Sequence, residues 1–189
     1  MTPDEAVVAV LDALDRAALP WMLVGSLASN FHGVPRATRD ADFVIAFDRG
    51  DVDTLAATLP SALRLDAQGA FEPVTGTTRY LIELQGSLFV CELFVLSDDA
   101  HDQERFARRQ RVPMFGRHAF VATAEDTIVT KLRWAKDAGR SKDRGDIRNI
   151  VALRRSGLDW PYIEHWAAAH GTTELLQTLR METDSERSR

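Results

Sequence analysis

The sequence predicts an α+β fold, with a domain of strands and helices followed by a helical C-terminal annex. Two observations lead to this prediction. Up to residue 122, short apolar runs that end at Gly or Pro alternate with segments whose apolar residues recur at helical spacing. From Thr123 onward the spacing is helical throughout. We therefore expect a core at 1–122, a helical region at 123–180 packed on it, and a flexible tail at 181–189.

Capping and stop signals define the first elements. Thr2 is a typical N-cap and Pro3 suits the first helical position, so a helix is expected to begin here and to end near Pro20. Apolar runs and their breakers predict five further elements in chain order: a strand at 21–24, a short helix at 27–31, a loop at 34–39, a strand at 40–47 and a surface helix at 51–59.

The remaining strands lie between residues 79 and 122. Segment 64–78 has too many Gly, Pro and Thr residues for an assignment. Strands are expected at 79–84 and 88–96, and a hairpin at 109–122 that turns at Phe115 and Gly116.

Three helices are expected in the C-terminal region. The first begins after Thr123 and stops at Gly139, and the third runs over 159–170. The second is expected to be capped by Ser141 and to end before Gly157, with a buried stripe formed by Ile147, Ile150, Val151 and Arg154.

Composition excludes several classes of protein. The chain has 189 residues, 45% of them hydrophobic, which is enough for an ordinary core and argues against disorder. Its one cysteine, Cys91, cannot build a disulfide framework. The N-terminus is acidic where a signal peptide would be basic, and no apolar run is long enough for a membrane helix. We therefore expect a soluble, cytoplasmic protein with no membrane partner.

Charge is unevenly distributed along the chain. The formal net charge is −5, which argues against a protein that coats nucleic acid generally. Segment 131–155, however, holds nine basic and three acidic residues, so it carries +6 and the remainder carries −11. Such a basic segment either steers a polyanion towards a site or balances the acidic body of the protein from within.

Asp40 and Asp42 form a candidate metal site. They lie two residues apart at the start of a predicted strand, so both side chains point to one face. Two like charges this close favour a cation between them, and a divalent metal suits carboxylate oxygens. The alternative is a solvated strand edge, or a turn in which Asp40 caps a loop.

Glu92 lies at the centre of an otherwise apolar strand. An unpaired buried carboxylate is unfavourable, so Glu92 needs a metal, an Arg or Lys partner, or exposure at a sheet edge. If its strand is a neighbour of the strand that carries Asp40 and Asp42, three carboxylates meet on one face, as a pair of Mg²⁺ ions requires.

Gly25 and Ser26 form a candidate phosphate site. They end one strand and begin a helix, where glycine permits close approach of a ligand and free N–H groups attract phosphate oxygens. An ordinary tight turn is the alternative.

Taken together, these residues resemble a known signature. Gly25-Ser26, His32-Gly33, Arg36, Thr38 and Asp40-Ala41-Asp42 resemble the first block of the polymerase-β-like nucleotidyltransferases, in particular the AbiEii-type toxins and related minimal nucleotidyltransferases. Downstream, Lys131, Arg140, Lys142-Asp143 and Asp146 resemble the lysine helix and acidic segment of the same group. The likeness spans roughly residues 20 to 155.

The resemblance implies a fold, cofactors and roles. It implies a mixed sheet flanked by helices, and a nucleoside triphosphate held over the Gly25-Ser26 turn. Asp40 and Asp42 would hold two Mg²⁺ ions, and Glu92, where the common pattern has aspartate, would activate the acceptor hydroxyl and complete the metal site. The implied nucleotide-binding residues are Gly25, Ser26, Arg36, Thr38 and Lys131.

The implied function is Mg²⁺-dependent transfer of a nucleoside monophosphate onto a hydroxyl. The acceptor would be RNA, such as a tRNA end, or a protein, in a toxin-type role that implies a cognate antitoxin. The departure at Glu92 supports an alternative, a catalytically idle module that binds a nucleotide or a protein. A small-molecule transferase of the aminoglycoside type is a third option, which the acidic excess permits.

Lys131 and three later residues complete the predicted site. The Lys131 ammonium would compensate the charge that builds on the departing pyrophosphate, unless it lies on a solvated helix face. Asp143 and Asp146 flank a buried helical stripe and are expected to be paired, with an orienting role shared by Arg140. Arg140, Lys131 and Arg36 are the candidate partners.

Overall fold

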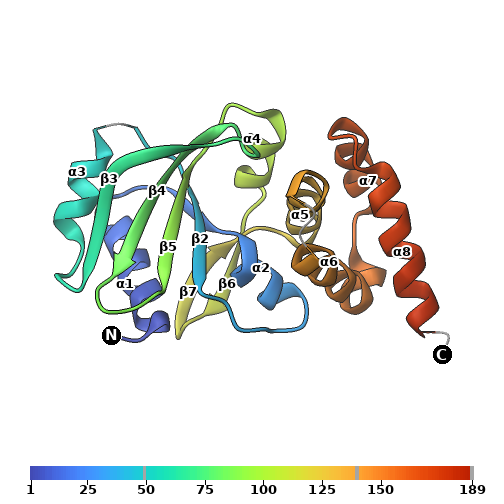
Figure 1. Ribbon diagram of the computed structural model, residues 1–189, viewed down its shortest axis with the longest axis horizontal. Coiled ribbons are helices and arrows are strands. Elements are labelled where there is room, and N and C mark those ends of the chain that lie inside the picture. Colours follow the sequence, from blue (N-terminus) through green and yellow to red (C-terminus); the bar gives the residue numbers. More distant parts are fainter. Residues whose placement is uncertain (49, 139–140, 188–189) are drawn as a thin grey trace. The chain divides into compact units, whose positions relative to one another are not determined.

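The computed structural model describes residues 1–48, 50–138 and 141–187, which form two compact units (Figure 1). The first unit comprises Met1–Leu27 and Ala37–Ala122, and the second comprises Ala28–Arg36 and Thr123–Arg189. Helix α2 (Gly25–His32) contributes its first turn to one unit and the rest to the other. Among the described residues, no helix is long and apolar enough to cross a lipid bilayer.

The first unit is built on a seven-stranded mixed sheet, which confirms the predicted fold class. The strand order is β3-β4-β5-β2-β1-β7-β6, in which β2 pairs with β5 and β1 with β7 in parallel, and the other neighbours are antiparallel. The strands are β1 (Trp21–Leu23), β2 (Asp40–Ile45), β3 (Leu63–Glu72), β4 (Thr77–Leu84), β5 (Val90–Val95), β6 (Gln110–Met114) and β7 (Arg117–Val121).

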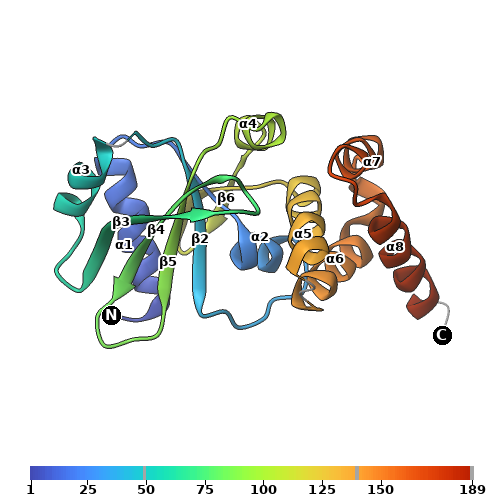
Figure 2. The same cartoon turned by 45° about the horizontal axis from the view of Figure 1, so that its top comes forward.

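Three further helices accompany the sheet in this unit: α1 (Pro3–Arg16), α3 (Asp51–Thr58) and α4 (Ala100–Ala107). Helix α1 begins as predicted, because Thr2 and Glu5 form a reciprocal capping box. Helices α1 and α3 contact one another and can be followed in Figure 2. The side chains of the central strands alternate between buried residues such as Phe43 and Leu93 and half-buried ones, so the two faces of the sheet differ in burial.

The predicted hairpin is present, and two elements of the first unit had no predicted counterpart. Phe115 and Gly116 both have positive φ, as a two-residue turn between antiparallel strands requires. Strand β3 gave no apolar alternation because it is an edge strand whose residues 67–71 are exposed. Helix α4 is mostly polar, and its one local signal is the Asp99 side chain, which caps it by accepting from the Asp102 N–H.

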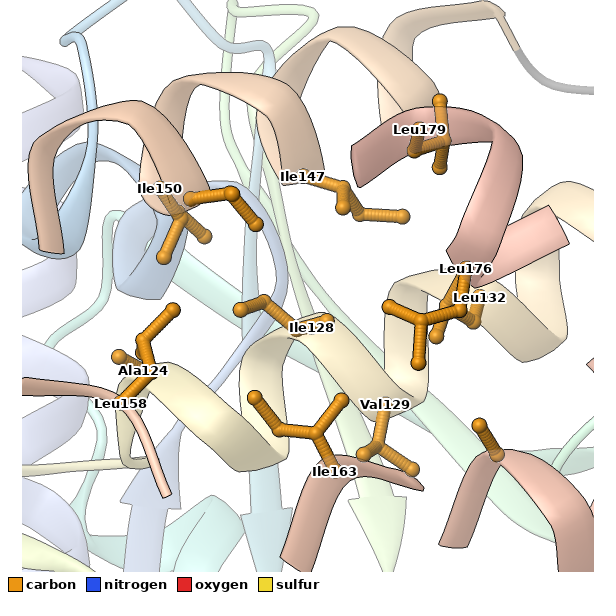
Figure 3. Packing of buried hydrophobic residues seen from close by; sticks show 12 residues of the cluster. Ala124, Ile128, Val129, Leu132, Ile147, Ile150, Leu158, Ile163, Leu176 and Leu179 are labelled. Carbon is orange, nitrogen blue, oxygen red and sulfur yellow. The ribbon is translucent and has the colours of Figure 1, made fainter. Parts of the chain in front are cut away.

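The second unit is a group of helices around one apolar cluster. They are α5 (Ala124–Ala138), α6 (Ser141–Arg154), the 3₁₀ turn η1 (Arg155–Gly157), α7 (Trp160–Ala169) and α8 (Thr173–Arg187). Figure 3 shows Ile128 of α5 among side chains of the neighbouring helices, including Ile147, Ile150 and Ile163. These residues carry the helical spacing that the sequence displays.

Two expectations for this unit need correction, and one lies outside the described residues. Arg154 is exposed rather than part of the buried stripe, since burial of a guanidinium is unfavourable, and it donates to the carbonyl oxygens of Phe31 and His32. Helix α8 is a fourth helix beyond the three expected, and it continues past Met181, where a flexible tail was expected, with Thr183 buried on it. The predicted helix stop at Gly139 falls outside the described residues.

Candidate active site

Asp40, Asp42 and Glu92 share one face of two neighbouring strands. Strands β2 and β5 run parallel, with Asp42 directly beside Glu92 and Asp40 beside Val90. Because side chains alternate along a strand, the three carboxylates point to the same face of the sheet. All three are half-buried, whereas Ala41 and the opposite face are buried. We call the face that carries Asp40, Asp42 and Glu92 the carboxylate face.

The carboxylate of Asp42 lies against the backbone of Gly25. Gly25 has a φ of +57°, and a Cβ built on it would lie 1.8 Å from Asp42 Oδ2. A hydrogen bond from the Val24 N–H to the Asp42 carbonyl oxygen, at 2.9 Å, holds the two segments together. Only glycine fits here, both for its backbone conformation and for the space. The structure therefore brings the Gly25-Ser26 turn and Asp42 together.

Thr38 contacts the first of the paired aspartates. Its hydroxyl donates to Asp40 Oδ1 at 2.5 Å, from the loop that leads into β2. This short hydrogen bond to a carboxylate fixes the orientation of Asp40. Thr38, which the resemblance assigns to the nucleotide, thus also orients a candidate metal ligand.

Glu92 has an arginine partner that the sequence did not name. Arg79 Nη1 on β4 donates to Glu92 Oε2 at 3.2 Å. Glu92 therefore has an Arg partner, which was one of the expected possibilities. That the partner is Arg79 follows only from the β4–β5 register, which places Arg79 on the carboxylate face. The sequence signal available was the spacing of Arg79, Leu81 and Glu83 along β4, because residues two apart on a strand lie on the same face.

Lys131 lies at the centre of a buried ion-pair network in the second unit. Its Nζ is 2.8 Å from Asp143 Oδ1 and 2.8 Å from Asp146 Oδ2. Asp146 also accepts hydrogen bonds from Nε and Nη2 of Arg36, both at 2.8 Å. The solvated-face interpretation of Lys131 is wrong, because this residue is only 5% exposed. The predicted pairing of Asp143 and Asp146 with Lys131 and Arg36 is confirmed.

The network depresses the pKa of one of its acids. Burial alone would raise the pKa of Asp146, but hydrogen bonds from Arg36 and Lys131 outweigh burial and lower that pKa below its usual value. Asp146 is therefore ionised at neutral pH. Arg140, the other residue predicted to have an orienting role, lies outside the described residues.

The His32-Gly33 pair of the first sequence block packs within the same unit. His32 is buried, and a Cβ built on Gly33 would lie 3.2 Å from Ile150 of α6. Asn30 further fixes the following loop, because its side chain exchanges two hydrogen bonds with the backbone of Arg36. This local packing places Arg36 where its guanidinium meets Asp146.

Much of the basic segment 131–155 is paired within the second unit. Arg148 and Arg155 contact Glu182 and Asp184 of α8, and Lys136 donates to a backbone carbonyl oxygen. The basic segment was expected either to steer a polyanion or to balance acidic charge within the protein, and these residues fit the second interpretation. The acidic partners lie on the helices of the same unit.

The carboxylate face has the donor chemistry of a divalent-cation site. Its donor set consists of carboxylate oxygens, which Mg²⁺ prefers. The missing Cβ of Gly25 also creates a cradle beside Asp42 in which a larger residue would displace the carboxylate. Asp42 thus combines the donor chemistry of a metal ligand with a position against a backbone that lacks a side chain.

Comparison with known proteins shows the fold. No family model and no curated protein matches the chain. Among solved structures, the solution structure of the antibiotic-resistance factor ANT(2'')-Ia matches with a TM-score of 0.64 and 15% identity over 95% of this chain and 96% of that one. The crystal structure of ANT(2'')-Ia with adenylyl-2''-tobramycin matches with a TM-score of 0.60 and 18% identity over 91% and 98%.

A third solved structure has the same architecture. An antigenic nucleotidyltransferase-like protein from Paracoccidioides brasiliensis matches with a TM-score of 0.55 and 19% identity, over 94% of this chain and 92% of that one. These likenesses extend over nearly the whole length of each chain. The chain therefore has the nucleotidyltransferase fold.

Proposed function

We propose that the protein is a Mg²⁺-dependent nucleotidyltransferase that moves a nucleoside monophosphate from a nucleoside triphosphate onto a hydroxyl group. One observation carries the proposal. Asp42 lies directly beside Glu92 and also against the Gly25 backbone, so metal-binding carboxylates adjoin a turn suited to phosphate. The nucleotidyltransferase fold of the chain adds support.

Asp40, Asp42 and Glu92 are assigned to hold two divalent cations. When bound, such ions lower the pKa of the acceptor hydroxyl and neutralise charge on the triphosphate. Thr38 keeps Asp40 oriented through its hydrogen bond.

Gly25 and Ser26 are assigned to the triphosphate. The absence of a Cβ at Gly25 lets phosphate oxygens approach the backbone, and the start of α2 carries the positive end of the helix dipole, which favours an anion. The Ser26 hydroxyl is one more donor at this position.

In the transfer step, the acceptor oxygen attacks the α-phosphorus and the α–β phosphoanhydride bond breaks. Pyrophosphate leaves with the electron pair of that bond. The proton of the acceptor hydroxyl passes to a carboxylate oxygen of Glu92, which lies next to Asp42 in the register. Glutamate is one methylene longer than aspartate, so the Glu92 carboxylate extends further from its strand than an aspartate carboxylate would.

The ion-pair network of the second unit is assigned an orienting role. Asp143 and Asp146 fix the ammonium of Lys131 and, through Asp146, the guanidinium of Arg36. Lys131 and Arg36 are the two cations that the resemblance assigns to the nucleotide. Arg140 belongs to the same proposal.

The acceptor proposed first is a hydroxyl of RNA, such as a tRNA end, or of a protein. This choice follows the resemblance to AbiEii-type toxins, and a toxin role with a cognate antitoxin and a cytoplasmic location belongs to it. The basic side chains Lys142 and Arg144, which are exposed at the start of α6, are compatible with an anionic acceptor.

A cationic aminoglycoside is a second candidate acceptor, which one observation favours. The first unit has 17 acidic and 10 basic residues, a formal charge of −7, on the chain segments that carry the three carboxylates. A structure with the same fold is a complex of ANT(2'')-Ia with an adenylylated tobramycin. An acidic surface attracts such polycations.

A transfer assay tests the proposal. Purified protein is incubated with each labelled triphosphate, Mg²⁺ and one acceptor pool at a time: total tRNA, lysate protein or an aminoglycoside panel. We expect label transfer by the wild type and by Asp53→Ala, which removes an exposed acid on α3, but not by Asp42→Ala. Nucleotide binding without transfer in any pool would favour the idle binding module instead.

A further inference from the structure

Arg79 and Glu92 form an ion pair between neighbouring strands of the first unit. Arg79 Nη1 donates to Glu92 Oε2 at 3.2 Å. The register places Leu81 directly beside Glu92 and Arg79 two residues away along β4, so the contact is diagonal. Both side chains are partly exposed, 32% for Arg79 and 21% for Glu92.

This pair places one positive charge beside three negative charges. Asp42 is the direct neighbour of Glu92, and Asp40 lies on the same face. Like charges at this spacing repel one another, and the guanidinium offsets part of that repulsion. A divalent cation that binds Glu92 must therefore replace the hydrogen bond from Arg79, and the positive charge of the guanidinium also repels it.

The guanidinium is incompletely hydrogen-bonded in this position. Its Nε is buried and has no hydrogen-bond partner among the described residues. A buried N–H without an acceptor is unfavourable, so the contact with Glu92 does not satisfy the whole group. Partly exposed ion pairs are also weak compared with metal coordination by several carboxylates. Both facts make the pair easy to displace.

We infer that Arg79 is a positioning residue that holds Glu92 on the carboxylate face and competes with a divalent cation for it. The inference rests on the proposed function, because it takes the three carboxylates as the cation site. It adds a residue that lies outside both sequence blocks and that sets the cation affinity of the site.

Arg79→Gln is the direct test, with Mn²⁺ as the probe because free Mn²⁺ is quantified by its paramagnetic resonance signal. We expect the dissociation constant for Mn²⁺ to fall about fivefold relative to the wild type, the effect of removing a partly exposed ion pair. Arg79→Lys, which keeps the charge, should stay close to the wild type.

Arg64→Gln is the matched control. Arg64 pairs with Glu83 at 2.6 Å on the same sheet, so its removal changes the net charge equally without touching the three carboxylates. We expect Mn²⁺ affinity to change little in this variant. If Arg79→Gln binds Mn²⁺ no more tightly than Arg64→Gln does, the inference is overturned.

Thermal unfolding gives a second readout that does not depend on activity. Without metal, Arg79→Gln should melt below the wild type, because the carboxylates lose their counter-charge. Saturating Mn²⁺ should raise its Tm more than that of the wild type. Equal shifts in both proteins would contradict the inference. Should Arg79→Gln not fold, Arg79→Met, which retains the apolar stem, replaces it.

Asp42→Asn separates the two levels of the proposal. If Asp42→Asn loses Mn²⁺ binding but Arg79→Gln binds Mn²⁺ as the wild type does, the result counts against the inference alone. Binding by the wild type that survives in Asp42→Asn counts against the carboxylate site, and hence against the proposed function as well.

Discussion

The carboxylate of Asp42 occupies the space that a side chain at residue 25 would need, since Oδ2 lies 1.8 Å from the position of a Cβ on Gly25. The start of α2 and the middle of β2 are therefore fitted to one another. This relationship explains why a glycine precedes Ser26.

Gly25→Ala should abolish activity by displacing Asp42. The substitution also strains the backbone, because φ is +57° at this position, at a cost of roughly 1–2 kcal/mol. Gly76→Ala is the matched control, since Gly76 has a φ of +66° but no atom lies within 4 Å of the position that a Cβ would take. We expect both variants to lose stability in urea unfolding, and only Gly25→Ala to lose nucleotidyl transfer. Retained transfer in Gly25→Ala would contradict the assignment of this turn.

Lys131→Met should be strongly destabilising. It leaves the buried Asp143 without its cation, and removing one partner of a buried pair costs about 3–5 kcal/mol. Lys136→Met, at an exposed position on the same helix, should cost far less. Chemical denaturation measures both free energies of unfolding. Adding Asp143→Asn to Lys131→Met should recover part of the loss, and its failure to do so would argue against a charge-pair origin.

The stability of the protein should fall in acid partly through Asp146. Because the folded-state pKa of Asp146 is lowered from its usual 3.8, the ionised form stabilises the fold above that value, and this contribution is lost as pH falls through the lower folded-state pKa. The free energy of unfolding should therefore decline less steeply below pH 3.8 in Asp146→Asn than in the wild type. Asp53→Asn, which changes an exposed acid outside the ion-pair network, is the matched control.

Cys91 should be unreactive in the folded protein. Burial, together with the charge of Asp42, raises the pKa of its thiol to about 12. We expect an aromatic disulfide reagent at pH 8 to modify it at least about a hundredfold more slowly in buffer than in denaturing urea. Rapid modification of the native protein would show that β5 opens readily.

Local signals predicted much of this molecule, and long-range pairing supplied the rest. The cap at Thr2 and the turn at Phe115 depend on neighbouring residues, and both are found as expected. Strand β3 lacked a sequence signal because an edge strand buries few apolar side chains. No residue near Arg79 in the sequence indicates that its partner is Glu92. That partner depends on the order and register of strands far apart in sequence.

The candidate site divides in the same way. The spacing of Asp40 and Asp42 predicted their common face from one strand alone, whereas the position of Glu92 beside them required β2 and β5 to be neighbours. The ion pair of Arg36 with Asp146 joins residues 110 positions apart, and it was foreseen only as one of several pairings because a buried acid requires a cation.

The position of β1 in the sheet has a consequence for synthesis of the chain. This apolar strand lies between β2 and β7, and its register with β7 joins Leu23 to Val121. Until the ribosome has released residue 121, one edge of β1 has no partner, and Trp21, Met22 and Leu23 lack part of their final cover. Nascent chains shorter than this are exposed to aggregation, and chaperones that shield apolar strand edges would act on them.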